Sequence, residues 1–119
     1  MKIRELAERL NLELISGAQG INREVTGAYV SDLLSDVMGH AGEGEVWITL
    51  QTHRNVIAIA SLKDLSGVIL VRNNIPDADS IEASDKENIP VFSTHYCTFE
   101  LSGLVYNLLS DQQKNNEIL

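Results

Sequence analysis

The chain lacks the features that mark secreted, disulfide-bonded or membrane-inserted proteins. Its single cysteine, Cys97, cannot form an internal disulfide. The N-terminus has no apolar stretch of the kind found in signal peptides, and the longest apolar run, Val56 to Ala60, is far shorter than the ~20 residues of a membrane span. We therefore expect a protein of the reducing cytoplasm with no membrane-spanning segment.

Basic residues are also scarce. The chain has 9 lysines and arginines against 17 aspartates and glutamates, which gives a formal net charge of −8. An acidic chain repels phosphate backbones and anionic lipids unless its basic residues cluster locally. Nucleic acid and membrane surfaces are therefore not expected partners.

The sequence contains no internal repeat, no low-complexity segment and no shift in composition that would divide it. With 119 residues and 44% apolar content, it has room for one domain with a real core. We expect this single domain to cover residues 1–110. The polar residues 111–119 are expected to form a frayed C-terminal tail.

The most informative segment runs from Glu45 to Asn74. It reads as a buried strand, a polar turn, an apolar helix at about residues 54–63 and a second buried strand, which is a βαβ unit. Such units form parallel sheets with right-handed crossovers. Because the helix is apolar on nearly all sides, we expect it to be covered on both sides, by the domain itself or by a partner subunit.

The rest of the chain continues this alternation. The expected elements are an amphipathic helix over 3–10, a strand over 12–15, a glycine turn over 17–20, a strand over 25–30, a helix over 33–38, an acidic helix over 77–87, a strand at 91–92 and a final helix from Thr98. The predicted fold class is α/β, a three-layer α/β/α domain with a mainly parallel sheet of four to five strands. The short N-terminal strand is expected to add an edge.

Short polar residues stand before several of these helices. Ser31-Asp32, Thr52 and Thr98 are expected to cap them, because a side-chain oxygen can satisfy the free amides of a first helical turn. The acidic helix is expected to face solvent and to turn Ile81 inward. Trp47 lies inside a strand and is expected in the core.

All parallel strands of a sheet deliver their following loops to one edge, where ligands of open α/β sheets bind. Arg54 stands at the start of a helix, beside free amides and the positive end of the helix dipole, and Arg72 and His53 add donors, so an anion such as a phosphate group is the best-matched ligand. The alternative is that these loops are polar only for solvation. The candidate ligand-binding residues are Asp32, Thr52, His53, Arg54, Arg72, Asn73, Asn74 and His95, with Thr94, Tyr96 and Cys97 at the same edge.

No catalytic residue, metal site or cofactor is expected. His95 and Cys97 could form a nucleophile pair, but no third residue that would orient them is identifiable. His40, His53, His95 and Cys97 lack the paired spacing of zinc ligands. The glycines between Gly39 and Gly44 follow a helix and open a strand, whereas a phosphate-binding loop follows a strand and opens a helix.

The order of these motifs resembles a known family. The segments MKIRELAERLNLELISGAQGINREVTGAYVSDLL, EVWITLQTHRNVIAIASLKDLSGVILVRNNIPD and IPVFSTHYCTFELSGLV together resemble the DRTGG domain along nearly the whole chain. The first segment is also similar to the N-terminal domains of HPr kinase/phosphorylases and of purine-catabolism regulators. Similar domains occur in bacterial phosphate acetyltransferases and beside CBS domains in regulated pyrophosphatases.

The resemblance implies a three-layer α/β fold and a homodimer that acts as an accessory, regulatory or dimerising module. The Asp-Arg-Thr turn of the family aligns with residues 52–55, so the arginine is kept as Arg54 while His53 stands at the aspartate position. The family's Gly-Gly pair aligns with Asn73-Asn74, and asparagine is the best non-glycine substitute where φ is positive. No catalytic residue is carried over, and the chain has no GxxxxGK[ST] sequence.

The sequence therefore predicts a non-catalytic regulatory or ligand-sensing module. We expect it to dimerise and to bind a small anionic metabolite, a nucleotide or a partner enzyme. The alternative is a structural protein-interaction subunit of a larger enzyme system that has no small ligand.

Overall fold

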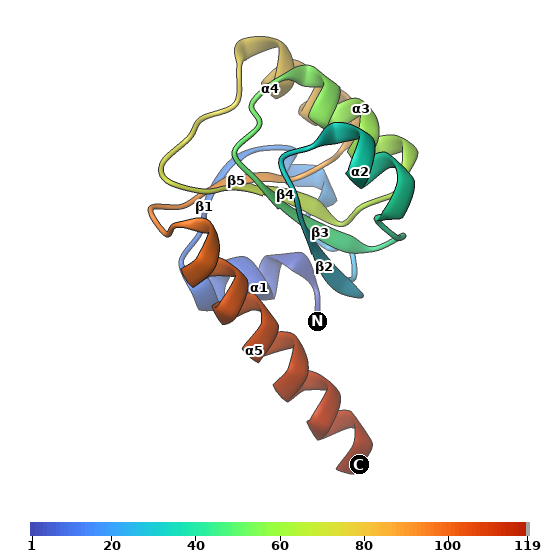
Figure 1. Cartoon of the computed structure of the whole chain (residues 1–119), viewed down its shortest axis with the longest axis vertical. Coiled ribbons are helices and arrows are strands. Elements are labelled where there is room, and N and C mark those ends of the chain that lie inside the picture. The colour runs from blue at the N-terminus through green and yellow to red at the C-terminus, as the bar shows by residue number, and fades with distance from the viewer. Residues whose placement is uncertain (119) are drawn as a thin grey trace.

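The computed structural model describes the backbone of residues 1–118 and the side chains of residues 1–114. Strands and helices alternate along most of this length (Figure 1). In chain order the elements are α1 (Ile3–Leu10), β1 (Glu13–Ser16), the 3-10 turn η1 (Ala18–Gly20), β2 (Gly27–Val30), α2 (Leu34–His40), β3 (Glu45–Thr49), α3 (Arg54–Leu62), β4 (Gly67–Leu70), α4 (Ala78–Glu87), β5 (Val91–Ser93) and α5 (Thr98–Ile118).

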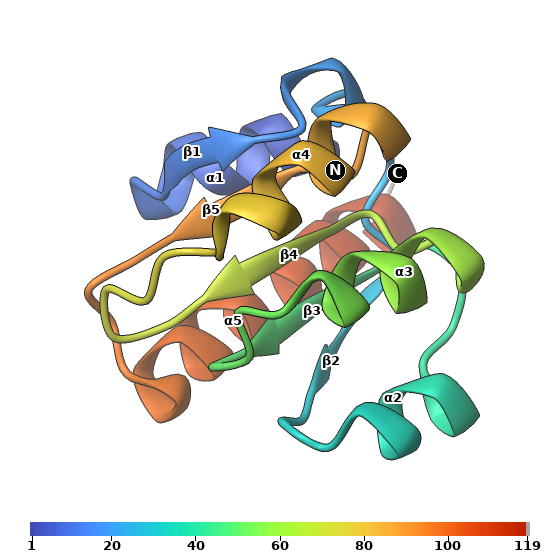
Figure 2. The same ribbon diagram turned by 90° about the horizontal axis from the view of Figure 1, so that it is seen from above.

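One five-stranded sheet forms the centre of the domain, with the strand order β1-β5-β4-β3-β2 (Figure 2). The four strands β2 to β5 are parallel. Strand β1 pairs antiparallel with β5 and places Glu13 opposite Ser93. The mainly parallel sheet with an added N-terminal edge strand is therefore confirmed.

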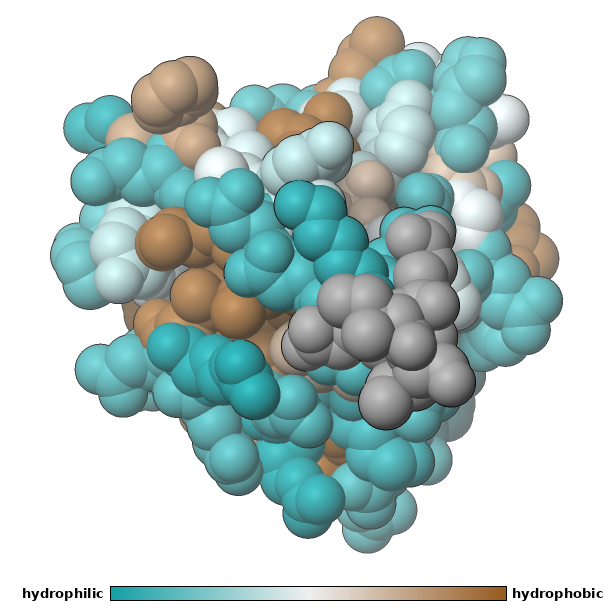
Figure 3. Space-filling view, turned by 90° about the horizontal axis from the view of Figure 1, so that it is seen from below, coloured by the Kyte–Doolittle hydropathy of each residue, from teal (hydrophilic) through white to brown (hydrophobic). Residues whose placement is uncertain are grey.

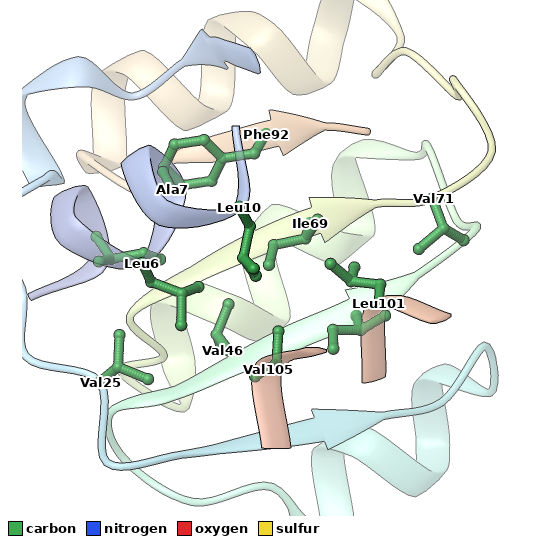
Figure 4. Packing of buried hydrophobic residues seen from close by; sticks show 12 residues of the cluster. Leu6, Ala7, Leu10, Val25, Val46, Ile69, Val71, Phe92, Leu101 and Val105 are labelled. Carbon is green, nitrogen blue, oxygen red and sulfur yellow. The ribbon is translucent and has the colours of Figure 1, made fainter. Parts of the chain in front are cut away.

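Helices cover both faces of the sheet, as expected for a three-layer α/β/α domain. In Figure 1, α2, α3 and α4 lie on one side of the sheet, and α1 and α5 lie on the other. On the α1 and α5 side, Leu6, Leu101 and Val105 pack on Ile69 and Phe92 of the sheet (Figure 4). Burying such side chains stabilises the fold by about 1.5–3 kcal/mol each.

The second core lies between the sheet and α3. Trp47 is fully buried there, as predicted, against Val56, Ile57 and Ala60 of the helix. Helix α3 packs against both α2 and α4. The nearly all-apolar helix is therefore covered by the domain itself and does not require a partner subunit. Its side chains that remain exposed are Arg54, Asn55, Ala58 and Leu62.

The predicted caps are wrong. Helix α2 begins at Leu34 and α3 at Arg54, and the residues in their cap positions, Leu33 and His53, make no side-chain capping bond. Helix α5 begins at Thr98 itself, so Thr98 is its first residue rather than its cap. A capping side chain must stand directly before the helix, and each predicted residue is misplaced by one or more positions.

The inward face of α4 also differs from the expectation. The helix buries Ser80 and Ser84, whereas Ile81 is only partly buried. The Ser84 hydroxyl donates to the Ile89 carbonyl (2.5 Å) and accepts from the Ser16 hydroxyl (2.9 Å). Helix α4 is thus held to the sheet partly by buried hydrogen bonds, which are satisfied as buried polar groups must be.

The glycine turn before β2 is confirmed and has a specific steric role. Gly17 has a φ of 74°, and a Cβ atom there would lie 2.0 Å from the Ile89 carbonyl oxygen. Only glycine fits both the left-handed backbone and this close approach. The turn packs against the end of α4, where Asn88 closes the helix with a φ of 55°.

Helix α5 continues through Ile118 and extends beyond the rest of the domain (Figure 1). The expected fraying of residues 111–119 stays a prediction. On the α5 side, Leu104 and Leu108 are only partly buried. Figure 3, seen from below in the frame of Figure 1, shows hydrophobic atoms gathered on one part of this surface among hydrophilic ones.

Candidate functional site

The loops that follow the parallel strands meet at one edge of the sheet. We define the carboxyl edge as residues 30–34, 50–54, 71–78 and 94–99. Strands β2, β3, β4 and β5 are successive neighbours in the sheet, and adjacent strands lie about 4.8 Å apart. The four segments therefore form one row about 15 Å long.

Asp32 joins the first two segments of this row. Its carboxylate accepts from the Thr49 hydroxyl (2.8 Å) and from the Leu50 amide (2.7 Å). Its carbonyl accepts from the Gln51 side-chain amide (2.9 Å). Asp32 thus stabilises the β2 and β3 loops against each other instead of capping α2, and both carboxylate contacts are made by its Oδ1 atom.

Thr52 and His53 join the second and third segments. The Thr52 carbonyl accepts from the Asp77 amide (3.1 Å) and from the Ser80 hydroxyl (2.7 Å). The His53 ring nitrogen Nδ1 lies 4.0 Å from the Asp77 carboxylate, and both side chains are exposed. At this exposed position the pair contributes little to stability and stays available to a ligand.

Arg54 is the first residue of α3. Its side chain lines an open groove of about 590 Å³ between α3 and α4. The same groove is lined by the acidic side chains of Asp79, Glu82 and Glu87 and by the basic side chain of Lys86. No side chain in the described part of the chain caps the start of α3. The first amides of α3 and its positive dipole end therefore face the carboxyl edge beside an arginine.

Arg72 and Asn73 form the turn after β4. Their φ values are 57° and 60°, and the Asn74 amide donates back to the Val71 carbonyl (3.2 Å), which is typical of a type I′ turn. Positive φ was expected at Asn73-Asn74 and occurs at Arg72 and Asn73 instead. The turn thus lies one residue earlier than expected, and the Asn74 side chain also donates to the Val71 carbonyl (2.8 Å).

The same turn is bonded to the fourth segment. The Arg72 amide donates to the Tyr96 carbonyl (2.9 Å), and the Asn73 amide donates to the Thr94 carbonyl (2.7 Å). His95 lies between these acceptors and packs on Tyr96, with ring centroids 4.3 Å apart. Backbone hydrogen bonds thus fix the position of Arg72 relative to the aromatic rings of His95 and Tyr96.

Apolar side chains that the sequence pattern did not predict are also exposed at this edge. Val30, Leu33, Leu50, Ile75 and Phe99 are all exposed there. The signal was present in the sequence, since Leu33, Leu50 and Ile75 stand in loops where polar residues are the rule. The carboxyl edge is therefore a mixed surface of basic and apolar side chains.

Behind this edge, between β4, α3 and α4, lies a cavity of about 10 Å³ that Thr52, Pro76 and Ser80 help to line. This is no more than the space of a single water molecule. The cavity behind the carboxyl edge is therefore too small for a phosphorylated metabolite.

The structure gives no support to catalytic or metal chemistry at this edge. Among the described residues, His95 and Cys97 share no hydrogen bond, and the Cys97 amide donates to the Glu100 carboxylate (3.4 Å). In the same part of the chain, no three histidine, cysteine, aspartate or glutamate side chains gather closely enough to hold a metal ion. No helix within residues 1–118 is both long and apolar enough to cross a membrane.

Comparisons with known proteins place this geometry in a family. No curated protein matches the chain. Among solved structures, the chain is similar to the CBS and DRTGG domains of the regulatory region of Clostridium perfringens pyrophosphatase, complexed with the activator diadenosine tetraphosphate. The TM-score is 0.68 at 18% identity, over 87% of this chain and 45% of that chain. The present chain thus spans less than half the length of that neighbour.

The family model of the DRTGG domain matches residues 5–108, which include every strand and the whole of the carboxyl edge. The two basic side chains of that edge, Arg54 and Arg72, lie within the match. The fold and this match together show that the chain belongs to the DRTGG domain family.

Proposed function

We propose that this domain is a non-catalytic regulatory module of the cytoplasm that binds a small anionic metabolite or nucleotide at its carboxyl edge. The observation that carries the proposal is the start of α3, which no described side chain caps and which begins with Arg54. A helix N-terminus next to arginine is a favourable place for a phosphate group, because free amides and the helix dipole both attract negative charge.

Three further groups support an anion at this place. Arg72 lies in the next loop, with its backbone bonded to the Tyr96 carbonyl, and His53 and His95 are exposed beside it. Charged donors make stronger hydrogen bonds to phosphate than neutral donors do. The carboxylate of Asp77 would repel an anion close to His53, so we expect the phosphate to lie nearer to Arg54 and Arg72.

The similar regulatory region supports nucleotides as the first ligands to test. That region of Clostridium perfringens pyrophosphatase was solved with diadenosine tetraphosphate as an activator. For the present chain, a nucleotide would combine phosphates near the arginines with a base on the apolar and aromatic side chains of the carboxyl edge. Tyr96 and Phe99 are suited to stack on such a base.

A thermal-unfolding screen tests this proposal. Purified protein is heated with and without nucleotides and phosphorylated metabolites at millimolar concentration. At a ligand concentration 100 times Kd, we expect stabilisation of about 2.7 kcal/mol, because the ligand binds only the folded state. No stabilisation by any compound in the screen would count against a sensor.

Matched arginine variants locate the site. Arg54→Gln and Arg72→Gln should each weaken the response to the best ligand by about tenfold, since each removes a charged contact. Arg4→Gln on α1 removes the same charge far from the carboxyl edge and should leave the response unchanged. An equal loss in all three variants would show only a general effect of net charge.

A second candidate function is a protein-interaction subunit with no small ligand. The five exposed apolar side chains of the carboxyl edge favour it, because patches of this kind commonly mark protein contacts. Co-purification of one stoichiometric partner enzyme, with no thermal response to any anion, would support this function instead.

A further inference from the structure

The open groove of about 590 Å³ between α3 and α4 has two helical walls. Each helix lines it with residues at the spacing i, i+3, i+4, i+7 and i+8. The α3 wall consists of Arg54, Ile57, Ala58, Ser61 and Leu62, and the α4 wall consists of Asp79, Glu82, Ala83, Lys86 and Glu87. This spacing marks one face of a helix, so the groove follows both helices for about two turns, or about 12 Å.

The two walls are held side by side at both ends. Helices α3 and α4 both connect parallel strands on the same face of the sheet, so they run in the same direction (Figure 2). Near their starts, the Ser80 hydroxyl donates to the Thr52 carbonyl (2.7 Å). Near their ends, the Ser61 hydroxyl donates to the Glu87 carboxylate (3.4 Å). A groove that is already ordered loses little conformational freedom when a partner binds.

The walls differ in their chemistry. Beyond Arg54 the α3 wall is uncharged, and Leu62 near its end is 70% exposed. The α4 wall belongs to the most acidic part of the chain. The segment from Asp77 to Glu87 has five acidic residues and one basic residue, a formal charge of −4, which is half of the −8 of the whole chain. One side of the groove is therefore mainly apolar and the other mainly acidic.

The charged side chains of the α4 wall are exposed and stay available to a partner. Among residues 1–114, whose side chains the structure describes, Asp79, Glu82 and Lys86 take part in no ion pair. A partner with charges of the opposite sign would be steered toward this wall and oriented by it. The excess of acid on α4 favours a basic partner.

The shape of the groove favours a helix over an extended segment. Beyond their first turns, the backbone amides of both walls are bonded within their own helices, so an extended chain would find few backbone partners there. A helix satisfies its own backbone groups. The small side chains of Ala58, Ser61 and Ala83 let such a helix approach closely, and its apolar face can lie against the α3 wall.

We propose that the groove between α3 and α4 is a docking site for a basic amphipathic helix of a partner protein. The apolar face of that helix lies on Ile57, Ala58 and Leu62. Its lysine or arginine side chains pair with Asp79 and Glu82. The acidic wall repels nucleic acid and anionic lipid, so neither fits the groove.

The partner is a different protein and not a second copy of this chain. Among the described helices, α1 is formally neutral, and α2, α4 and α5 are acidic. Only α3 has a net positive charge, and it is itself a wall of the groove. The docking site does not rest on the proposed anion function, although Arg54 borders both places.

Fluorescence anisotropy with a pair of synthetic peptides tests the docking site. Both peptides are stapled helices of about 14 residues with leucine and alanine on one face, which is long enough to fill the groove. One carries lysines beside that face, and the other carries glutamates at the same positions. We expect the lysine peptide to bind the wild-type protein with a Kd on the order of 10 µM, and the glutamate peptide to bind at least about tenfold more weakly.

Matched variants locate the bound peptide. Glu82→Lys in the α4 wall should weaken binding of the lysine peptide about tenfold, whereas Glu8→Lys, the same change at an exposed position of α1, should not. Leu62→Ser in the α3 wall should weaken binding about fivefold, whereas Leu33→Ser at the carboxyl edge should not. The two leucines are matched in exposure, at 70% and 64%. Because all four side chains are exposed, the variants should fold, and circular dichroism checks this.

Three results would overturn the proposal. The first is no binding of the lysine peptide to the wild-type protein at about 500 µM, well above the expected Kd. The second is equal binding of the lysine and glutamate peptides. The third is a loss of binding in either control variant as large as in its matched groove variant, because the peptide would then bind elsewhere or respond only to net charge.

The docking site and the anion site can fail separately. Arg72→Gln lies outside the groove, so it should weaken the thermal response to ATP and leave peptide binding unchanged. If no nucleotide or phosphate stabilises the protein but the lysine peptide binds as described, the docking site stands and the anion-sensing function is lost. If ATP stabilises the protein but the lysine peptide does not bind, the docking site is overturned and the anion site stands.

Discussion

At the scale of single residues, Arg72 is the least relaxed part of the carboxyl edge. It holds a φ of 57°, next to Asn73 at 60°, and such a left-handed backbone suits glycine or asparagine better than arginine. The position is fixed by the Arg72 amide bond to the Tyr96 carbonyl. Backbone strain often clusters at functional sites, which agrees with the proposed anion contact of Arg72.

We expect Arg72→Gly to raise the free energy of unfolding by about 1 kcal/mol, because relief of the backbone strain outweighs the added freedom of the unfolded chain. Urea denaturation measures this change. Asn73→Gly is the matched control and should gain less, since asparagine tolerates positive φ. A loss of stability in Arg72→Gly would show that its side chain supports the fold.

A second effect of a single residue is the shifted pKa of the Asp36 carboxyl on α2. Side-chain hydrogen bonds from Ser31 and then from Tyr29 hold the pKa of this carboxyl below its ordinary value. The Tyr29 hydroxyl lies 3.0 Å from both carboxylate oxygens, and burial and then this contact raise the Tyr29 pKa. The folded state therefore binds a proton at Asp36 less tightly than the unfolded state, whose pKa is about 3.9.

The lowered pKa of Asp36 determines how this residue makes the stability of the fold depend on pH. The contribution of Asp36 is fully present above the unfolded pKa and is lost as pH falls through the lower folded pKa. Asp36→Asn should therefore reduce the loss of thermal stability between about pH 5 and pH 2. Asp111→Asn removes an equal charge from α5 and serves as the control. Identical pH profiles for wild type and Asp36→Asn would contradict the assignment.

At the scale of elements, hydrophobic periodicity was sufficient to predict the strands and helices, because the βαβ pattern places apolar residues at both sheet faces. It was not sufficient to predict the caps. Asp32 was expected on α2, but the Leu50 amide and the Thr49 hydroxyl on the neighbouring strand bind its carboxylate. Partners brought by the tertiary fold cannot be read from local spacing.

The inward face of α4 was also not predictable from local spacing, because its buried serines form hydrogen bonds with residues from other parts of the chain. Ser84→Ala should lower the free energy of unfolding by about 1–3 kcal/mol, since it leaves the buried Ser16 hydroxyl and Ile89 carbonyl without their partner. Ser35→Ala on the exposed side of α2 should change stability by less than about 0.5 kcal/mol. Equal effects in chemical denaturation would mean that the Ser84 bonds contribute nothing.

At the scale of the whole molecule, the candidate ligand residues do lie at one edge, but they do not form one pocket. Arg54 lines the groove beside α4, whereas Arg72 is bonded to the β5 loop. The exposed apolar side chains among them were not predicted, because residues at such an edge are usually polar.

The most direct test of anion sensing is an amide NMR titration of the isotopically labelled chain with ATP, with inorganic phosphate in parallel. We expect concentration-dependent shifts of the amides of Arg54, Asn55, Arg72 and Asn73, and no comparable shifts in α1 or β1. Shifts confined to other surfaces, or no shifts at millimolar ATP, would contradict an anion site at the carboxyl edge.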